Sequence, residues 1–112
     1  MMTIAQLRDH GANVDEALKR CLNNETFYLG LVSKALQDPS FDQLKEAVEA
    51  GDLGRGFEIA HALKGVMGNL SLTPISKPVQ EITELLRART DTDYTPYLEE
   101  ILARKNELKA LL

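Results

Sequence analysis

The chain has 112 residues, of which 44% are apolar and 27% are charged, and its formal net charge is −4. This length and balance predict one folded domain and exclude a largely disordered chain. The negative net charge and the absence of tryptophan argue against nucleic acid as a partner. No apolar run reaches the roughly 18 residues of a membrane span, so we expect no membrane partner either.

The cysteine count and the first residues predict the compartment. Cys21 is the only cysteine, so it cannot form an internal disulfide, and we expect it to be buried and inert. The polar segment that follows Met1 does not resemble a signal peptide. We therefore expect a whole, cytoplasmic protein.

The first third of the chain is predicted to form short helices. Thr3–Gln6 matches a capping box and opens a helix that ends near Gly11. Asn13 and Asn24 are predicted to cap two further helices, because their side-chain oxygens can accept hydrogen bonds from free backbone N–H groups. Pro39 ends the second of these, since proline disfavours helical geometry in the residue before it.

Four longer helices are predicted in the rest of the chain. Ser40–Gln43 is a second capping-box match, Gly51 is a stop signal, and Asp52 starts the next helix. The expected spans are 40–50, 52–71, 77–89 and 95–112, with the segment 24–37 competing for a place.

Two starts compete for the third long helix. Thr73-Pro74 is a good start, but it leaves Pro78 inside the helix. Ser76 as the cap places Pro78 in the first turn, where proline is tolerated, and we favour that start. The polar residues 90–93 form a loop, and Thr95-Pro96 opens the last helix.

Apolar residues recur at helical spacing along nearly the whole chain, and strand-like alternation is absent. Short connections between long amphipathic helices favour an up-and-down helical bundle, so the predicted fold class is all-α. We expect a single domain over residues 1–112, with N-terminal helices in 1–37 and the bundle core in 38–112. The bundle core contains the histidine helix, 52–71.

The histidine helix has two different faces. On a helical wheel at about 100° per residue, an apolar stripe is predicted to face the core. The stripe consists of Ile59, Leu63, Val66 and Leu70. The opposite face carries His61, Lys64, Gly65 and Gly68. Each glycine costs about 1 kcal/mol of helix stability relative to alanine, so two on one face require a reason other than stability.

An unhindered imidazole beside an ammonium group suits a nucleophile that accepts a phosphoryl group. It does not suit a metal site, because no second ligand recurs at metal-binding spacing, and no hydrolytic triad is recognisable. The glycine-rich run Gly51–Gly56 is not a phosphate loop, because no strand precedes it and no Gly-Lys-Ser/Thr follows.

Several neighbours of His61 have weaker predicted roles. Phe57 lies one turn earlier on the exposed side and is expected to contribute to partner docking, or to pack against the N-terminal helices. Met67 is a second apolar candidate for docking. Asn69 lies at the flank as a weak site candidate, and Gly68 could instead permit close helix contact.

The run His61-Ala62-Leu63-Lys64-Gly65, followed by Gly68-Asn69-Leu70, closely resembles the signature of histidine-containing phosphotransfer (HPt) domains of two-component phosphorelays. The resemblance extends over most of the chain and implies an antiparallel four-helix bundle with extra N-terminal helices. It implies that His61 is phosphorylated, that Lys64 is a phosphate-side partner and that Gly65 leaves room for the phosphoryl group. Val66, Met67 and Ser71 depart from the family pattern. We expect Met67 and Ser71 to affect the choice of partner.

The expected function is that of a phosphocarrier and not an enzyme. His61 would accept a phosphoryl group from a receiver-domain aspartate and pass it to another response regulator. Partners would be receiver domains or a hybrid histidine kinase, Mg²⁺ would be bound by the receiver, no cofactor would be bound by this chain, and the chain would be a monomer. Two alternatives stay open: a phosphoacceptor module of a histidine kinase, and a helical interaction module with an inert histidine.

Overall fold

The computed structural model describes residues 1–112 and contains seven α-helices and no β-strand, which confirms the predicted all-α class. The helices are α1 (Ile4–Asp9), α2 (Val14–Arg20), α3 (Glu25–Leu36), α4 (Ser40–Glu49), α5 (Leu53–Asn69), α6 (Thr73–Arg87) and α7 (Thr95–Lys109). None of these helices is both long enough and apolar enough to cross a membrane.

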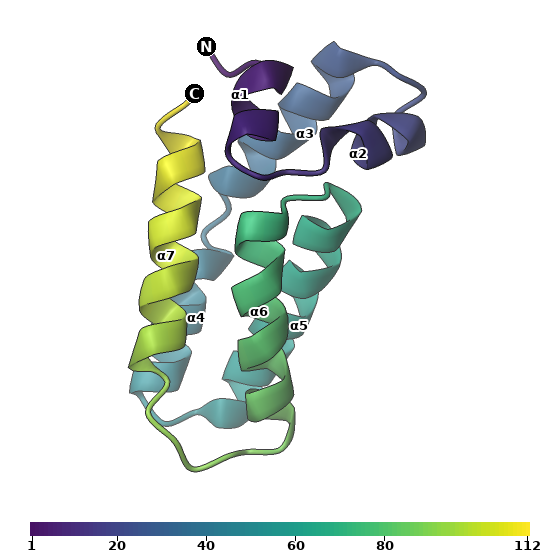
Figure 1. The fold of residues 1–112 in the computed structure, drawn as a ribbon. Coiled ribbons are helices and arrows are strands. Elements are labelled where there is room, and N and C mark those ends of the chain that lie inside the picture. Colours follow the sequence, from purple (N-terminus) through teal and green to yellow (C-terminus); the bar gives the residue numbers. More distant parts are fainter.

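The four helices α4 to α7 form an antiparallel up-and-down bundle (Figure 1). α5 packs against both α4 and α6, and α7 packs against α6 and α4, which closes the bundle. α1, α2 and the first part of α3 lie across the end of the bundle where the chain passes from α5 to α6 (Figure 1). This is the predicted bundle with additional N-terminal helices, and α3 packs on α7 without becoming a fifth full-length member.

One continuous apolar core joins the N-terminal helices to the bundle. Its buried side chains come from all seven helices and include Leu7 of α1, Tyr28 of α3 and Leu108 of α7. Burying such side chains supplies most of the favourable free energy of folding. The bundle therefore holds α5 through contacts with α4 and α6, and the outward face of α5 is exposed to solvent.

The predicted helix starts that depend on short side-chain caps are confirmed. The side chains of Asn13, Asn24 and Asp52 each accept a hydrogen bond from the backbone N–H three residues later, over 3.4, 3.0 and 3.1 Å. Thr3 and Gln6 form the reciprocal capping box at the start of α1. These bonds satisfy N–H groups that have no partner inside the helix.

The predicted capping box at Ser40 is wrong. Ser40 is the first residue of α4 and Pro39 holds the cap position, so no side chain caps this helix. The Asp38 carboxylate instead accepts the Ser40 N–H over 2.7 Å, and hydrogen bonds from Ser40 hold the pKa of that carboxyl below its usual value. The local turn formed by aspartate replaces the serine cap.

The predicted start of α6 at Ser76 is also wrong, because the helix begins at Thr73 and contains Pro78. An interior proline removes one backbone hydrogen bond. Here Ile75 and Pro78 are both buried in the helix interface, and the earlier start places both on that face. Packing therefore outweighs the local preference that favoured Ser76.

Candidate functional site

The buried face of α5 differs from the predicted stripe. Its buried residues are Gly56, Ala60, Leu63, Met67 and Leu70. Val66, which we placed in the core, is 44% exposed, and Met67, which we placed on the surface, is fully buried. The buried face is thus rotated by about 50° from the predicted one, at 100° per residue. The helical wheel predicted the wrong face because it ranks residues by hydrophobicity, on which glycine and alanine score low. These small residues nevertheless allow two helices to approach most closely.

The glycines of α5 serve this geometry in different ways. A Cβ at Gly56 would lie 3.1 Å from Val48 Cγ2 and 3.6 Å from Leu86 Cδ2, so Gly56 permits close contact with α4 and α6. A Cβ at Gly65 or Gly68 would meet nothing within 4 Å. The alternative role for Gly68 in close helix contact is therefore wrong.

His61 lies in the middle of α5 on the exposed face, together with Gly65 and Gly68. The imidazole is stacked on the Phe57 ring, with 5.6 Å between the ring centroids and 22° between the ring planes. Phe57 is half-buried and packs against the core cluster. Phe57 is thus less exposed than expected, and it connects the imidazole to the body of the bundle.

Two arginines, one at the end of α6 and one just after it, lie over the Phe57 ring. The guanidinium carbon of Arg87 is 4.9 Å from the ring centroid, and that of Arg89 is 5.6 Å away. Cations over an aromatic face are attracted by its quadrupole. The aromatic ring that contacts His61 is thereby flanked by two permanent positive charges.

Lys64 lies on the flank of α5 that faces α6, as the rotation of the buried face requires. Its side chain is half-buried, and Nζ is 3.8 Å from Glu84 Oε1. The second carboxylate oxygen of Glu84 is 3.3 Å from Arg87 Nε. Glu84 therefore bridges a cation on α5 and a cation on α6.

Asn69 and Ser71, both predicted near the docking surface, lie at the end of α5 and just beyond it. Asn69 is exposed, whereas Ser71 is buried and has a positive φ of 54°. Arg20 Nη1 donates hydrogen bonds to the Asn69 carbonyl over 2.8 Å and to Ser71 Oγ over 3.1 Å. Two departures from the family pattern, Met67 and Ser71, therefore lie in the interior and not on the surface.

The N-terminal segment also fixes the end of α5. The Tyr28 hydroxyl donates to the Leu70 carbonyl over 2.7 Å, and the Asn13 N–H donates to the Ser71 carbonyl over 3.0 Å. Burial raises the pKa of Tyr28 to about 12. The carbonyls just beyond the end of α5 thus obtain partners from the cap residue of α2 and from α3.

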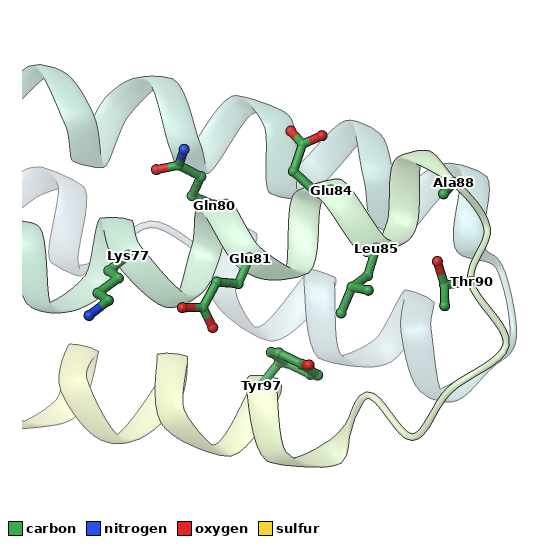
Figure 2. Close-up of a pocket in the computed structure, with 8 residues that line it drawn as sticks. All are labelled: Lys77, Gln80, Glu81, Glu84, Leu85, Ala88, Thr90 and Tyr97. Atoms are coloured by element: carbon green, nitrogen blue, oxygen red, sulfur yellow. The ribbon is translucent and has the colours of Figure 1, made fainter.

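A shallow groove runs between α6 and α7, next to the ion pairs of Lys64, Glu84 and Arg87. It has a volume of about 730 Å³, and Figure 2 shows its lining side chains. The lining residues are Lys77, Gln80, Glu81, Glu84, Leu85, Ala88, Thr90 and Tyr97. His61 is not among them, so the imidazole does not line the groove. Of the residues in the Lys64–Glu84–Arg87 ion pairs, only Glu84 lines it.

The comparison with known families identifies the bundle. The family model described as Hpt domain matches residues 33–112, which include the whole of α4 to α7. The chain belongs to the Hpt domain family. This confirms the resemblance found in the sequence. Hpt domains act in phosphotransfer in two-component systems as phosphocarriers, and not as catalysts. Neither a curated protein nor a solved structure gives a significant match.

Sequence reasoning missed Glu84, Arg87 and Arg89 as neighbours of the histidine helix. No spacing rule could have found them, because they lie on or just after another helix and meet α5 through the register of helix packing. The weak available signal was the i,i+3 pair of Glu84 and Arg87 on one face of α6. In this Hpt domain the exposed imidazole thus has an aromatic ring beside it and three cations nearby, while no three His, Cys, Asp or Glu side chains cluster as a metal site.

Proposed function

We propose that this Hpt domain accepts a phosphoryl group on His61 from a phospho-aspartyl receiver domain and passes it to another response regulator. The observation that carries the proposal is the open space around the imidazole. Gly65 and Gly68 leave the face C-terminal to His61 clear, and nothing in the packing of the bundle requires glycine at either position.

The transfer is a nucleophilic displacement at phosphorus. The lone pair of one imidazole nitrogen of His61, which we take to be Nε2, forms the N–P bond as the P–O bond to the receiver aspartate breaks. The bonding electron pair leaves with the aspartate oxygen, the ring keeps its other N–H, and the product is a phosphorylated imidazolium. The return step to a second receiver is the reverse of the same displacement.

The surrounding side chains support this step in different ways. Stacking on Phe57 fixes the plane of the ring and so reduces the orientations from which the nitrogen attacks. Lys64 carries a positive charge close to the site, which favours the anionic phosphoryl group. We assign Mg²⁺ to the receiver domain, because this chain offers no cluster of carboxylates for it.

We further propose that the protein acts as a monomer in the cytoplasm. A carrier has to present the same exposed imidazole to successive partners, which a self-associated His61 face would prevent. Such encounters are transient and use small interfaces. The single cysteine agrees with a reducing compartment, because it has no partner for an internal disulfide.

The test is phosphoryl transfer from a phosphorylated receiver domain in the presence of Mg²⁺. We expect an acid-labile, alkali-stable phosphoprotein that is absent in His61→Gln. His10→Gln is the matched control, because His10 is also exposed but lies at the end of α1, where its Nδ1 is 2.9 Å from the Gln6 carbonyl oxygen.

Equal labelling of His61→Gln and wild type would overturn the proposal. Labelling only by a kinase domain with ATP, and from no receiver, would favour the kinase-module alternative. Absence of labelling from either source would leave the inert helical module.

A further inference from the structure

We propose that Glu84 is a positioning residue that weakens the hold of this domain on the phosphoryl group and so favours its onward transfer. The inference rests on the proposed phosphorylation of His61. Glu84 holds Lys64 and Arg87 while the imidazole is free, and it competes for the same cations once His61 is phosphorylated.

The geometry places Glu84 between the two cations. Its carboxylate oxygens lie 3.8 Å from Lys64 Nζ and 3.3 Å from Arg87 Nε, and all three side chains are partly exposed. Figure 2 shows Glu84 pointing away from α7, on the side of α6 from which Gln80 also projects. The carboxylate is therefore directed away from α7 and toward the histidine helix.

The charge cluster is related to His61 in two ways, by helix spacing on α5 and by contacts through Phe57. Lys64 lies one turn after His61 on α5, where residues three apart are neighbours on the helix surface. Arg87 lies over the Phe57 ring, which is itself stacked on the imidazole. A charge added to the imidazole thus lies one helical turn from Lys64 and is separated from Arg87 by one aromatic ring.

Phosphorylation changes the balance of charge in this cluster. Lys64, Arg87 and Glu84 together carry one net positive charge, and a phosphoryl group adds about two negative charges with strong acceptor oxygens. Lys64 and Arg87 are then attracted to the phosphoryl oxygens, while Glu84 both retains them and repels the new anion. Removal of the Glu84 charge therefore stabilises the phosphorylated form more than the free form.

The measurable quantity is the equilibrium between phospho-receiver with free His61 and free receiver with phospho-His61. Partly exposed charge pairs contribute up to about 1 kcal/mol, so Glu84→Gln should shift this equilibrium toward phospho-His61 by about two- to fivefold at low salt. The half-life of the isolated phosphohistidine should lengthen in the same sense. The shift should shrink at 0.5 M salt, because the Debye length falls to a few ångströms and charges farther apart are screened from one another.

Glu81→Gln is the matched control. Glu81 lies on the same helix one turn earlier, is exposed, and points toward α7 in Figure 2. It belongs to none of the ion pairs of the chain. Both substitutions remove one negative charge, so an effect of net charge alone would be the same in the two variants.

A mutant cycle decides whether Glu84 acts through the cations, by comparing the effect of Glu84→Gln with and without Lys64 and Arg87. In a background that carries Lys64→Gln and Arg87→Gln, the shift caused by Glu84→Gln should largely disappear. A shift that persists in this background would overturn the positioning role, because it would come from direct repulsion alone. Circular dichroism on each variant verifies that the bundle is folded.

The outcomes separate this inference from the proposed function. If wild-type protein is not labelled on His61, the proposed function fails and the inference fails with it. If His61 is labelled but Glu84→Gln and Glu81→Gln behave alike, only the role of Glu84 is refuted.

Discussion

The two faces of α5 contain the same residue type for different reasons. On the buried face, Gly56 has neighbouring side chains of α4 and α6 so close that even one additional carbon would touch them. On the exposed face, Gly65 and Gly68 have nothing within reach of a Cβ. A helix interior disfavours glycine by about 1 kcal/mol at each position. On the buried face, close packing explains the glycine; on the exposed face packing does not, and we attribute the two glycines to the phosphoryl group on His61.

The largest effect should come from filling the exposed face. Gly65→Leu should reduce phosphoryl transfer from a receiver by about 100-fold, because a side chain beside His61 displaces the attacking geometry. The melting temperature should not fall, since the space there is open. Transfer rates and thermal unfolding, measured on the same preparation, check both parts.

Gly30→Leu is the control for Gly65→Leu. Gly30 is an exposed glycine in α3, and a Cβ there also meets nothing within 4 Å. It should transfer at the wild-type rate. If both variants transferred normally, the open face around His61 would have no role in the chemistry.

The opposite result is expected on the buried face. Gly56→Leu inserts four carbons against Val48 and Leu86 and should lower the free energy of unfolding by about 3 kcal/mol. Urea denaturation measures this loss. Protein that remains folded should keep much of its transfer activity, and an unchanged stability would contradict the close packing of α4, α5 and α6.

The buried hydrogen bond from the Tyr28 hydroxyl to the Leu70 carbonyl should make the stability of the protein depend on pH. The pKa of Tyr28 is about 12 in the fold and 10.0 when free, so the folded state binds this proton more tightly. The contribution is complete below pH 10 and is lost as the pH rises from 10 to 12. The loss is on the order of 2 to 3 kcal/mol, at 1.36 kcal/mol per pKa unit.

Tyr28→Phe isolates this contribution. It should remove the additional alkaline loss, and at neutral pH it should cost about 1 kcal/mol because the Leu70 carbonyl loses its partner. Urea denaturation at pH 7, 9 and 11 compares the two proteins. Parallel stability curves for wild type and variant would refute the role of the buried hydroxyl.

Local rules predicted the parts of this fold that depend on neighbouring residues. The caps at Asn13, Asn24 and Asp52 were found because a side-chain oxygen and the N–H that it accepts lie three residues apart. The motif around His61 was recognisable for a similar reason, since its residues lie within one short run of the sequence. The start of α6 was not found, because the burial of Pro78 depends on other helices.

The phase of α5 and the identity of the charged neighbours required tertiary structure. Val66 and Met67 are adjacent and both apolar, and the wheel placed the wrong one, Val66, in the core. The answer depends on Gly56, whose missing side chain allows α5 to turn that edge toward α4 and α6. The same rotation carries Lys64 to Glu84, a pairing between residues of two helices that no sequence spacing indicates.

The smallest expected effect concerns the far end of the exposed face. Gly68→Ala adds one carbon that meets nothing, so it should raise the free energy of unfolding by about 1 kcal/mol. Gly30→Ala, at a similarly open site, should raise stability by a similar amount and leave transfer unchanged. Gly68→Ala should slow transfer, though less than Gly65→Leu, because position 68 lies two turns from His61 on the same face. If both alanine variants gained stability and neither slowed transfer, the space needed around His61 would end at Gly65. Neither packing nor phosphoryl transfer would then explain the glycine at position 68.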